Sequence, residues 1–287
     1  MDTRRAVCLN LDADAELAMG AGYTPTKRVL EAMRPHVQTL ASSFLRKGDV
    51  LVDENSEAGI ARDLPGIAFC PTPRAISLLT RAGAVPVDHP SFEILRRVNS
   101  RAFCASLGQT MPEAQFVTDA AVAVDLLSSS PALSTTWRVK PAFGMAGRGQ
   151  RLITAGSPNA AEKTFVEACI ERDGGVQIEP NVRIEIELGL HGVLTQDGEL
   201  TMGRVVRQHS DVHGAWISTE PLPQSDHETA LREELTKIAT ALHAAGYFGP
   251  FGIDAFVYEG NRLQPRSEIN ARYSMGFPQS QLPIFSS

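Results

Sequence analysis

The sequence of 287 residues lacks several features that would assign it to a specialised class of proteins. It begins with charged residues and no apolar run of signal-peptide length, and no segment approaches the ~20 consecutive apolar residues of a membrane span. Its four cysteines lie far apart without a CxxC pair, which argues against a zinc site and against a disulfide framework. We therefore expect a cytoplasmic protein with reduced thiols.

An excess of positive charge is also missing. There are 27 Lys and Arg residues against 33 Asp and Glu residues, so the formal charge of −6 does not favour nucleic acid or an anionic membrane as a partner. There is no internal repeat and no low-complexity tract. The length and the hydrophobic content of 43% allow roughly two domains, each with its own core.

The first part of the chain has the pattern of a small α/β unit. From Gly48 to Pro90, the short apolar runs DVLVDE, GIAFC and GAVPV alternate with the helical segment RAISLLTRAG, which predicts a parallel sheet. A helix is expected next, with Ser91 as its N-cap and Gly108 at its end. We place the domains at 1–95 and 96–287.

The second part has the pattern of antiparallel strands with helices alongside. TWRVK, QRLIT, VQIE, RIEIELGLHGVL and ELTMGRVVRQ are strand-like. A helix is expected between the second and third of these, with Ser157 as its N-cap and Gly174 at its end. Ser225 and Glu228 have capping-box spacing ahead of a later amphipathic helix. The expected class is thus α/β followed by α+β.

A glycine-rich loop, PAFGMAGRG, connects TWRVK and QRLIT. Gly144, Gly147 and Gly149 permit positive φ and a close approach of backbone N–H groups to phosphate. A Walker A or Rossmann loop is disfavoured because a strand follows, where those motifs open a helix. One interpretation is a flap over a triphosphate, with Lys140 as a cation on the preceding strand, and the alternative is an ordinary surface hairpin.

Acidic residues recur on the next strands. Glu179 ends one strand, and Glu185 and Glu187 share a face of the following one because they are two residues apart. Ribose hydroxyls would suit such acceptors, and the backbone over 179–182 would suit an adenine edge. Ordinary solvated carboxylates are the alternative.

The last two strands, FGIDAFVYE and RLQPRSEIN, flank the turn EGN and predict a hairpin. Asp254 lies on the first strand, and Glu268 and Asn270 share one face of the second. Two carboxylates and an amide oxygen form an oxygen-only set that suits Mg²⁺. The alternative is an edge hairpin with ordinary charges.

Taken in order, VKPAFGMAGRG, IEP, GIDAF and LQPRSEINARYSMG resemble the ATP-grasp superfamily over residues 96–287, and the N-terminal unit is similar to the domain that precedes its grasp. The resemblance implies an ATP cleft between two lobes and Mg²⁺ held by Asp254, Glu268 and Asn270. Arg272 and then Arg207 match cations for substrate or developing charge. The implied nucleotide contacts are Arg101, Lys140, Gly144, Met145, Ala146, Gly147, Gly149, Glu179, Val182, and Glu185 or Glu187. Arg101 stands where many members have a lysine, and the two cations differ in geometry.

The function that these features predict is an ATP-dependent, ADP-forming carboxylate–amine ligase that works through an acylphosphate. ATP and Mg²⁺ are the expected cofactors, and a small carboxylate and a small amine are the expected partners. A homodimer is compatible with the sequence. The alternatives are an ATP-grasp phosphotransferase, a nucleotide-binding protein without catalysis, and, less favoured, a carboxylate–thiol ligase.

Overall fold

The structure is a computed structural model that describes residues 4–144, 149–211 and 216–284. Its N-terminal part is a parallel sheet in the order β2-β1-β3-β4. The strands of this sheet are β1 (Ala6–Cys8), β2 (Val50–Leu51), β3 (Pro65–Ala68) and β4 (Val85–Pro86). The parallel sheet expected from the alternating runs is therefore confirmed.

Three helices accompany this sheet, namely α1 (Ala13–Met19), α2 (Lys27–Phe44) and α3 (Pro73–Arg81). Only α3 was expected from the sequence. Its side chains Ala75, Leu78 and Leu79 are buried at helical intervals. The helix α2 buries only Leu40 and Phe44 and contains Pro35, and a proline in the interior of a segment argues against a helix when the sequence is read alone.

The segment after the parallel sheet forms two helices where one was expected. Ser91 is confirmed as the N-cap of α4 (Phe92–Val98), because its hydroxyl accepts a hydrogen bond from the N–H of Ile94. The second helix, α5 (Arg101–Ser106), has its own N-cap in Ser100, which accepts from the N–H of Phe103. The proposed domain boundary at residue 95 stays a prediction.

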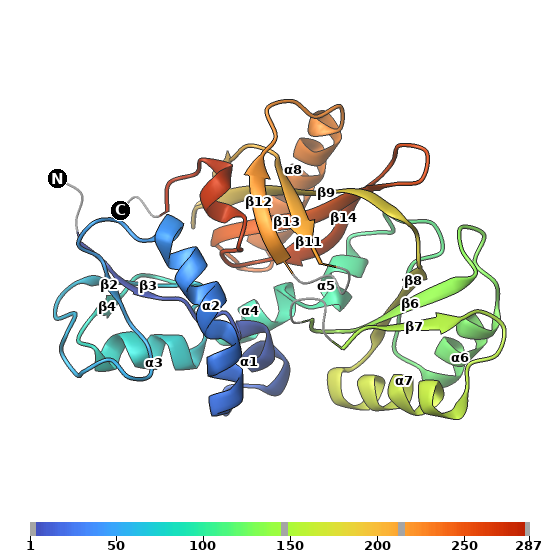
Figure 1. Ribbon diagram of the computed structural model, residues 1–287, viewed down its shortest axis with the longest axis horizontal. Coiled ribbons are helices and arrows are strands. Elements are labelled where there is room, and N and C mark those ends of the chain that lie inside the picture. Colours follow the sequence, from blue (N-terminus) through green and yellow to red (C-terminus); the bar gives the residue numbers. More distant parts are fainter. Residues whose placement is uncertain (1–3, 145–148, 212–215, 285–287) are drawn as a thin grey trace.

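A second sheet lies at the opposite end of the long axis from the parallel sheet, with two helices beneath it in Figure 1. Its strand order is β5-β8-β6-β7, and all its pairings are antiparallel. The strands are β5 (Gln115–Val117), β6 (Thr136–Pro141), β7 (Arg151–Thr154) and β8 (Val176–Pro180), and the helices are α6 (Ala120–Ser128) and α7 (Ala160–Asp173).

The start of α7 corrects one detail of the sequence analysis. Asn159, not Ser157, is the N-cap, and it forms a capping box with Glu162. The side-chain oxygen of Asn159 accepts a hydrogen bond from the backbone N–H of Glu162, and the Glu162 carboxylate accepts one from the backbone N–H of Asn159. The predicted end at Gly174 is confirmed, since this residue has the left-handed backbone of a C-cap.

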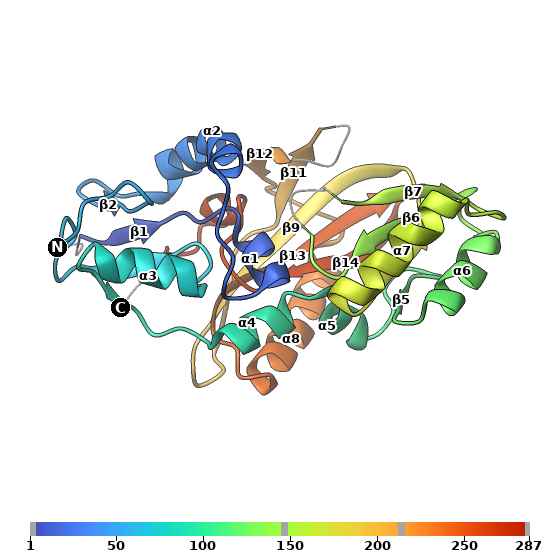
Figure 2. The same ribbon diagram turned by 90° about the horizontal axis from the view of Figure 1, so that it is seen from below.

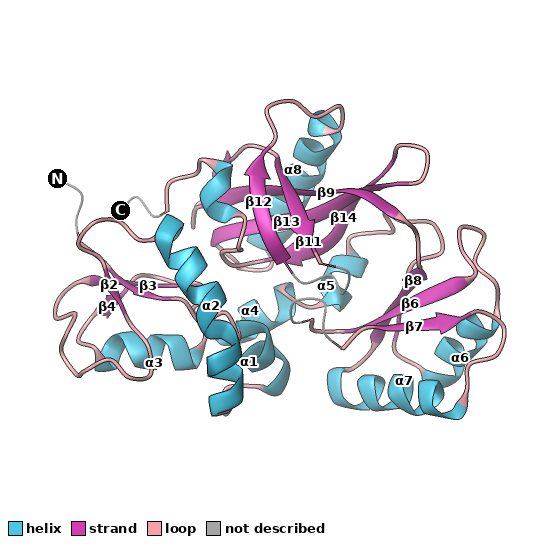
Figure 3. Cartoon of the chain, in the orientation of Figure 1, coloured by secondary structure: helices cyan, strands magenta, loops and turns pink. Residues whose placement is uncertain are grey.

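The largest sheet runs between the two ends of the molecule (Figures 1 and 3). Its order is β12-β11-β9-β13-β14, and β10 pairs with β9 at one end. The strands are β9 (Ile184–Leu194), β10 (Leu200–Met202), β11 (Val206–Ser210), β12 (Trp216–Pro221), β13 (Gly249–Tyr258) and β14 (Arg262–Asn270), and a short 3-10 helix, η1 (Phe277–Ser280), follows. The predicted final hairpin is β13 with β14.

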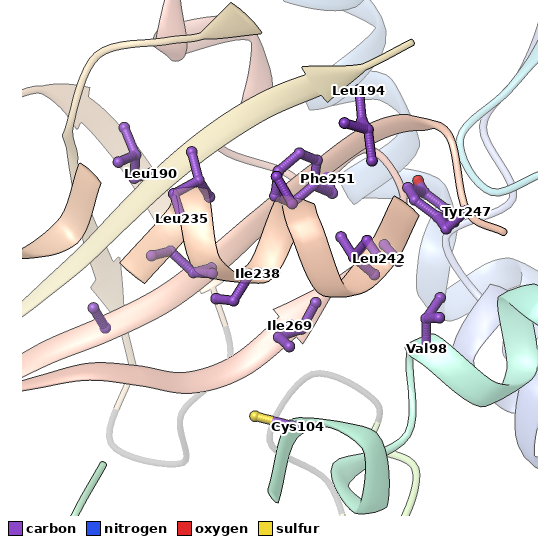
Figure 4. Packing of buried hydrophobic residues seen from close by; sticks show 14 of the residues in the cluster. Val98, Cys104, Leu190, Leu194, Leu235, Ile238, Leu242, Tyr247, Phe251 and Ile269 are labelled. Carbon is purple, nitrogen blue, oxygen red and sulfur yellow. The ribbon is translucent and has the colours of Figure 1, made fainter. Parts of the chain in front are cut away.

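One helix, α8 (Glu228–Ala244), covers a face of this sheet. Figure 4 shows its buried residues Leu235, Ile238 and Leu242 packed against side chains of β9, β13 and β14. The predicted capping box is not formed, because the Ser225 hydroxyl accepts from the N–H of His227 and the helix begins after that residue.

Figure 2 shows α4 and α5 beside α8 and between the two ends of the molecule. The expected fold class, a small parallel α/β unit followed by antiparallel sheets with helices, is confirmed. Among the described residues, no helix has the length and apolar character that crossing a membrane would require.

Candidate nucleotide and metal site

A cavity of about 900 Å³ opens among the three sheets. The sequence-predicted residues that line it are Arg101, Lys140, Gly144, Glu179, Val182, Glu185, Glu187, Arg207, Asp254, Glu268, Asn270 and Arg272. The predicted Gly149 is described but is not among the lining residues. Met145, Ala146 and Gly147 lie outside the described residues. The chain thus brings residues from distant parts of its sequence to one cavity.

Three of the predicted cations are each paired with a carboxylate. Lys140 Nζ lies 2.5 Å from Glu179 Oε1 across neighbouring strands β6 and β8. Arg101 Nη2 donates to both oxygens of Glu268, at 3.0 and 3.1 Å. Arg272 donates to Asp14 through Nε at 3.1 Å and through Nη2 at 2.8 Å. Each of these acids thus fixes the position of its cation.

Gly144 lies against the guanidinium of Arg101. A Cβ placed on Gly144 would clash with Nη2 and Nη1 of Arg101, so a larger residue here would require the Arg101 side chain to move. Arg101 also donates through Nη1 to the carbonyl of Pro141, at 2.7 Å. The guanidinium is therefore packed directly under the first residues of the glycine-rich loop.

The acidic set lies where β13 and β14 pair. Asp254 is directly opposite Glu268, and Gly252 is opposite Asn270. The register then shifts, because Gln264 is the next partner and pairs with Phe256, so that residues 265–267 of β14 face the single residue 255 of β13. Such a bulge re-aims side chains at the rim of a sheet.

Two amide groups orient the Asp254 carboxylate. Gln208 of β11 donates to Oδ1 and Asn270 of β14 donates to Oδ2, both at 2.9 Å. The Ser267 hydroxyl, in the bulge, donates to the Asp254 carbonyl at 3.1 Å. The carboxylate is thus held from β14, which pairs with β13, and from β11, whose Gln208 reaches it across the intervening strand β9.

The two carboxylates of the set have opposite pKa shifts. Burial, together with the neighbouring charge of Glu268, raises the pKa of Asp254 to about 6. Burial also acts to raise the pKa of Glu268, but the cations Arg101 and Lys140 outweigh it and the net shift is downward. Glu268 therefore stays ionised at neutral pH, and it makes ionisation of Asp254 harder.

This donor set fits a hard divalent cation. Two half-buried carboxylates that repel each other, with an amide oxygen beside them, are the kind of oxygen ligands that Mg²⁺ takes in proteins. Among the described residues there is no cluster of three or more His, Cys, Asp and Glu side chains suited to a metal. The set has only two such side chains, and its third donor is the amide of Asn270.

The region predicted for adenine and ribose, residues 179–187, also lines the cavity. Val182 packs against Met111, Phe256 and Tyr258. Two backbone positions predicted to meet adenine cannot donate, because Pro180 has no N–H and the N–H of Asn181 donates to the carbonyl of Thr136.

Glu185 and Glu187 both line the cavity. Glu185 forms an ion pair with Arg183 at 3.2 Å. Either residue remains a candidate for the ribose.

Arg207 and the histidines are placed differently. Arg207 lines the cavity, and its side chain has no hydrogen-bond or ion-pair partner among the residues that the structure describes. His209 forms a pair with Glu220 at 3.1 Å on the exposed strand β12. His191 is fully buried, and burial lowers its pKa to about 4 while its Nε2 lies 2.7 Å from the Ser274 hydroxyl.

Several residues of the site were not found from the sequence. Gln208 lies two residues after Val206 on β11, so the two side chains share a face of the strand. The alternation of side chains along this strand would therefore have pointed to Gln208. Asp14 had no comparable signal, because its partner Arg272 is far away in the chain. Ser274 and His191 come together through the packing of the segment around η1 on β9.

No family model and no curated protein match this sequence. Solved structures do match. The chain is similar to N5-carboxyaminoimidazole synthetase from Staphylococcus aureus complexed with ADP, at 16% identity and a TM-score of 0.56 over 96% of this chain and 72% of that one.

It is also similar to biotin carboxylase from Campylobacter jejuni in a β,γ-ATP complex, at 14% identity and a TM-score of 0.60, over 96% of this chain and 67% of that one. D-alanyl-alanine synthetase A from Vibrio cholerae matches at 13% identity and a TM-score of 0.55, over 99% of this chain and 92% of that one. These likenesses, at 13–16% identity, show that the chain shares the fold of these structures.

Proposed function

We propose that this chain is an ATP-dependent, ADP-forming ligase that joins a carboxylate to an amine. The observation that carries the proposal is the convergence, in one cavity, of the cations Arg101 and Lys140 with the acidic pair Asp254 and Glu268 and with Arg272. The names of the similar structures, which include two synthetases, support the same class of reaction.

The proposed reaction has two balanced steps. A carboxylate oxygen of the substrate attacks the γ-phosphorus of ATP, the bond to the β,γ-bridging oxygen breaks, and ADP leaves. The amine nitrogen then attacks the acyl carbon, the bond from this carbon to the phosphate oxygen breaks, and inorganic phosphate and a proton leave. Neither step needs a protein nucleophile, so no Ser/His/Asp or Cys/His arrangement is required.

ATP is proposed to occupy the side of the cavity formed by β6, β7 and β8. Lys140 and Arg101 exchange Glu179 and Glu268 for phosphate oxygens, which are stronger anionic partners. The apolar lining on that side suits adenine, and Glu185 or Glu187 accepts from ribose. The apolar side chains are Leu152, Val182, Ile184 and Phe256.

Mg²⁺ is proposed to be held by Asp254, Glu268 and Asn270. When bound, it would neutralise charge on the phosphoryl oxygens as the γ-phosphoryl group moves. Gln208 of β11 keeps the Asp254 carboxylate oriented from across the strand β9. Asp254 must be ionised to bind the metal ion. Because its pKa in the metal-free protein is about 6, most of this carboxyl group is ionised only above pH 6.

Arg272 and Arg207 are proposed to contact the carboxylate substrate and the transferring phosphoryl group. Arg272 follows the metal-site strand β14 directly, and Arg207 lies on β11 beside Gln208. A guanidinium can bind both oxygens of a carboxylate at once. The cytoplasmic location and the homodimer stay predictions.

Hydroxylamine provides a test that does not require the natural amine. It converts any acylphosphate into a hydroxamate, so a panel of small carboxylic acids can be screened with ATP, Mg²⁺ and hydroxylamine for ADP and hydroxamate. We expect both products, in equal amounts, with at least one acid. Formation of a phosphate ester from an alcohol in place of a hydroxamate would indicate a phosphotransferase, and absence of ADP with every substrate would indicate a binding protein.

A further inference from the structure

A buried histidine on the strand β9 contacts a serine that lines the cavity. His191 is 1% exposed, and burial lowers its pKa to about 4, so its imidazole is neutral at physiological pH. Its Nε2 lies 2.7 Å from the hydroxyl of Ser274, and its Nδ1 has no hydrogen-bond partner among the described residues. Because a buried polar atom without a partner is unfavourable, packing alone does not account for a histidine at this position.

Two glycines make room for this imidazole. Gly252 of β13 is directly opposite His191, and a Cβ on it would lie 2.6 Å from Cδ2 of the ring. A Cβ on Gly276 would lie 3.3 Å from Cε1. Phe277 packs edge-on against the same ring, with the ring centroids 5.7 Å apart. These close neighbours restrict the orientation of the imidazole.

Ser274 is presented to the cavity next to a residue proposed to bind the acid. Arg272 and Ser274 both line the cavity, whereas Tyr273 between them is buried. The ring of Tyr273 packs on Phe44 and Phe277, with centroid distances of 4.9 and 4.8 Å. The carbonyl of Ser274 accepts from the N–H of Phe277 at 3.1 Å. We call this part of the cavity, around Arg272 and Ser274, the acid site.

The direction of the bond between His191 and Ser274 depends on which ring nitrogen carries the proton. If Nδ1 carried it, Ser274 would donate to Nε2, and the N–H of Nδ1 would be buried without an acceptor. If Nε2 carries it, His191 donates to the Ser274 oxygen, and only a lone pair of Nδ1 stays unpaired. Among buried backbone groups, an unpaired N–H is rarer than an acceptor with an unused lone pair, and the same preference places the proton on Nε2.

With the proton on Nε2, the hydroxyl proton of Ser274 has no acceptor in the part of the chain that the structure describes. We propose that His191 directs this proton into the acid site, where Ser274 donates a hydrogen bond to the carboxylate of the acid substrate beside Arg272. This inference rests on the proposed ligase function. A hydrogen bond to an ionised carboxylate is stronger than one between neutral groups. His191 acts only through Ser274, so it is a positioning residue.

The proton on the imidazole can be located in the ligand-free protein. Two-bond proton–nitrogen NMR correlations distinguish the two neutral forms of a histidine, and the signals of His191 are identified by their absence from His191→Gln. We expect a neutral ring with its proton on Nε2. A proton on Nδ1 would overturn the inference, because Ser274 would then give its own proton to the imidazole.

The serine is tested with acetate, a minimal carboxylate probe. Ser274→Ala should weaken acetate binding in saturation-transfer NMR, and should lower kcat/KM for the most active acid of the hydroxylamine screen, by about tenfold or more. The affinity for ATP, measured by calorimetry, should not change. Ser128→Ala removes an exposed hydroxyl of α6 and should behave as the parent in all three measurements.

The histidine is tested by a double-variant cycle. His191→Leu leaves no unpaired nitrogen, so it should unfold in urea no earlier than the parent, yet it should lower kcat/KM by about threefold or more. Adding His191→Leu to Ser274→Ala should cause no further loss, because the histidine acts through the serine. His191→Gln, whose amide can donate from the position of Nε2, should recover most of the activity.

The outcomes separate the two proposals. A proton on Nε2 and acetate binding that depends on Ser274, without hydroxamate from any acid, would keep the acid site and overturn the ligase reaction. Parental hydroxamate formation by Ser274→Ala would keep the ligase and overturn the role of Ser274. Additive losses in the double variant would overturn the role of His191. A parent that does not bind acetate would also overturn the inference.

Discussion

Arg101 donates hydrogen bonds through Nη2 to both carboxylate oxygens of Glu268. Arg101 is nevertheless predicted to bind phosphate, and Glu268 is predicted to bind a metal ion. A triphosphate that takes Arg101 leaves Glu268 without its cation. A divalent cation that takes Glu268 repels Arg101 toward the phosphates. In the proposed function, the two binding events are therefore coupled through this pair.

Glu268→Gln separates these two effects. The variant frees Arg101, so it should bind ATP more tightly than the parent when Mg²⁺ is absent. With Mg²⁺, it should lower turnover by at least about 100-fold, because a charged ligand of the metal is lost. Calorimetry with ATP in the presence of a chelator measures the first effect, and ADP release measures the second.

Glu171→Gln is a suitable control for this variant, since it removes an exposed acid on the outer helix α7. It should leave both measurements unchanged. If Glu268→Gln bound metal-free ATP no better than the parent, this would contradict the proposal that Arg101 leaves Glu268 to bind phosphate. Parental turnover at saturating ATP and Mg²⁺ would remove Glu268 from the metal site.

Lys140→Ala should weaken ATP binding and also destabilise the fold. Lys140 and Glu179 are 9% and 6% exposed, so removal of the lysine leaves a buried carboxylate without its cation. The cost of breaking such a pair is about 3–5 kcal/mol. The double variant Lys140→Met with Glu179→Gln should regain much of the stability but not the ATP affinity. Urea unfolding and calorimetry distinguish the two losses, and a double variant that binds ATP normally would exclude Lys140 from the site.

The core under the site depends on α8. Leu235 is fully buried against the largest sheet, so Leu235→Ala should lower the free energy of unfolding by about 2–5 kcal/mol. The exposed Thr240→Ala on the same helix should change it by less than about 0.5 kcal/mol. Equal urea midpoints for the two variants would contradict this packing.

Local patterns predicted the acidic set because its geometry is local. Glu268 and Asn270 are two residues apart on one strand, and the turn Glu259–Gly260–Asn261 fixes the partner strand within a few residues. The bulge at 265–267 was not predictable in this way. Within the bulge, the side chain of Arg266 pairs with Glu234 of α8 and donates to the carbonyl of Gly108, and both partners are remote in the sequence.

Contacts between remote segments had no signal in the sequence. The bond between Asp14 and Arg272 depends on how the parallel sheet docks beside β14, and nothing in either segment specifies the other. The N-cap of α7 was predicted wrongly because two neighbouring residues could each cap the helix. Ser157 and Asn159 are both good capping residues, and only Asn159 is followed at the right distance by Glu162.

The raised pKa of Asp254 makes the stability of the metal-free protein depend on pH. Its pKa rises from an ordinary value of 3.8 to about 6 in the fold, so the folded state binds this proton more tightly than the unfolded state does. The stabilisation from the proton is complete below the unfolded pKa and is lost as the pH rises through the folded pKa. Between pH 5 and pH 7 the loss from this group should be about 1 kcal/mol.

Asp254→Asn isolates this contribution, because other titrating groups are common to both proteins. Urea unfolding of parent and variant, with a chelator present, gives the difference in their free energies of unfolding at pH 5, 6 and 7. The parent should lose stability relative to the variant as the pH rises, since the ionised Asp254 then lies opposite the ionised Glu268. A difference that is constant over this range, or that moves the other way, would show that Asp254 is already ionised at pH 5, and the repulsion attributed to the two carboxylates would have to be abandoned.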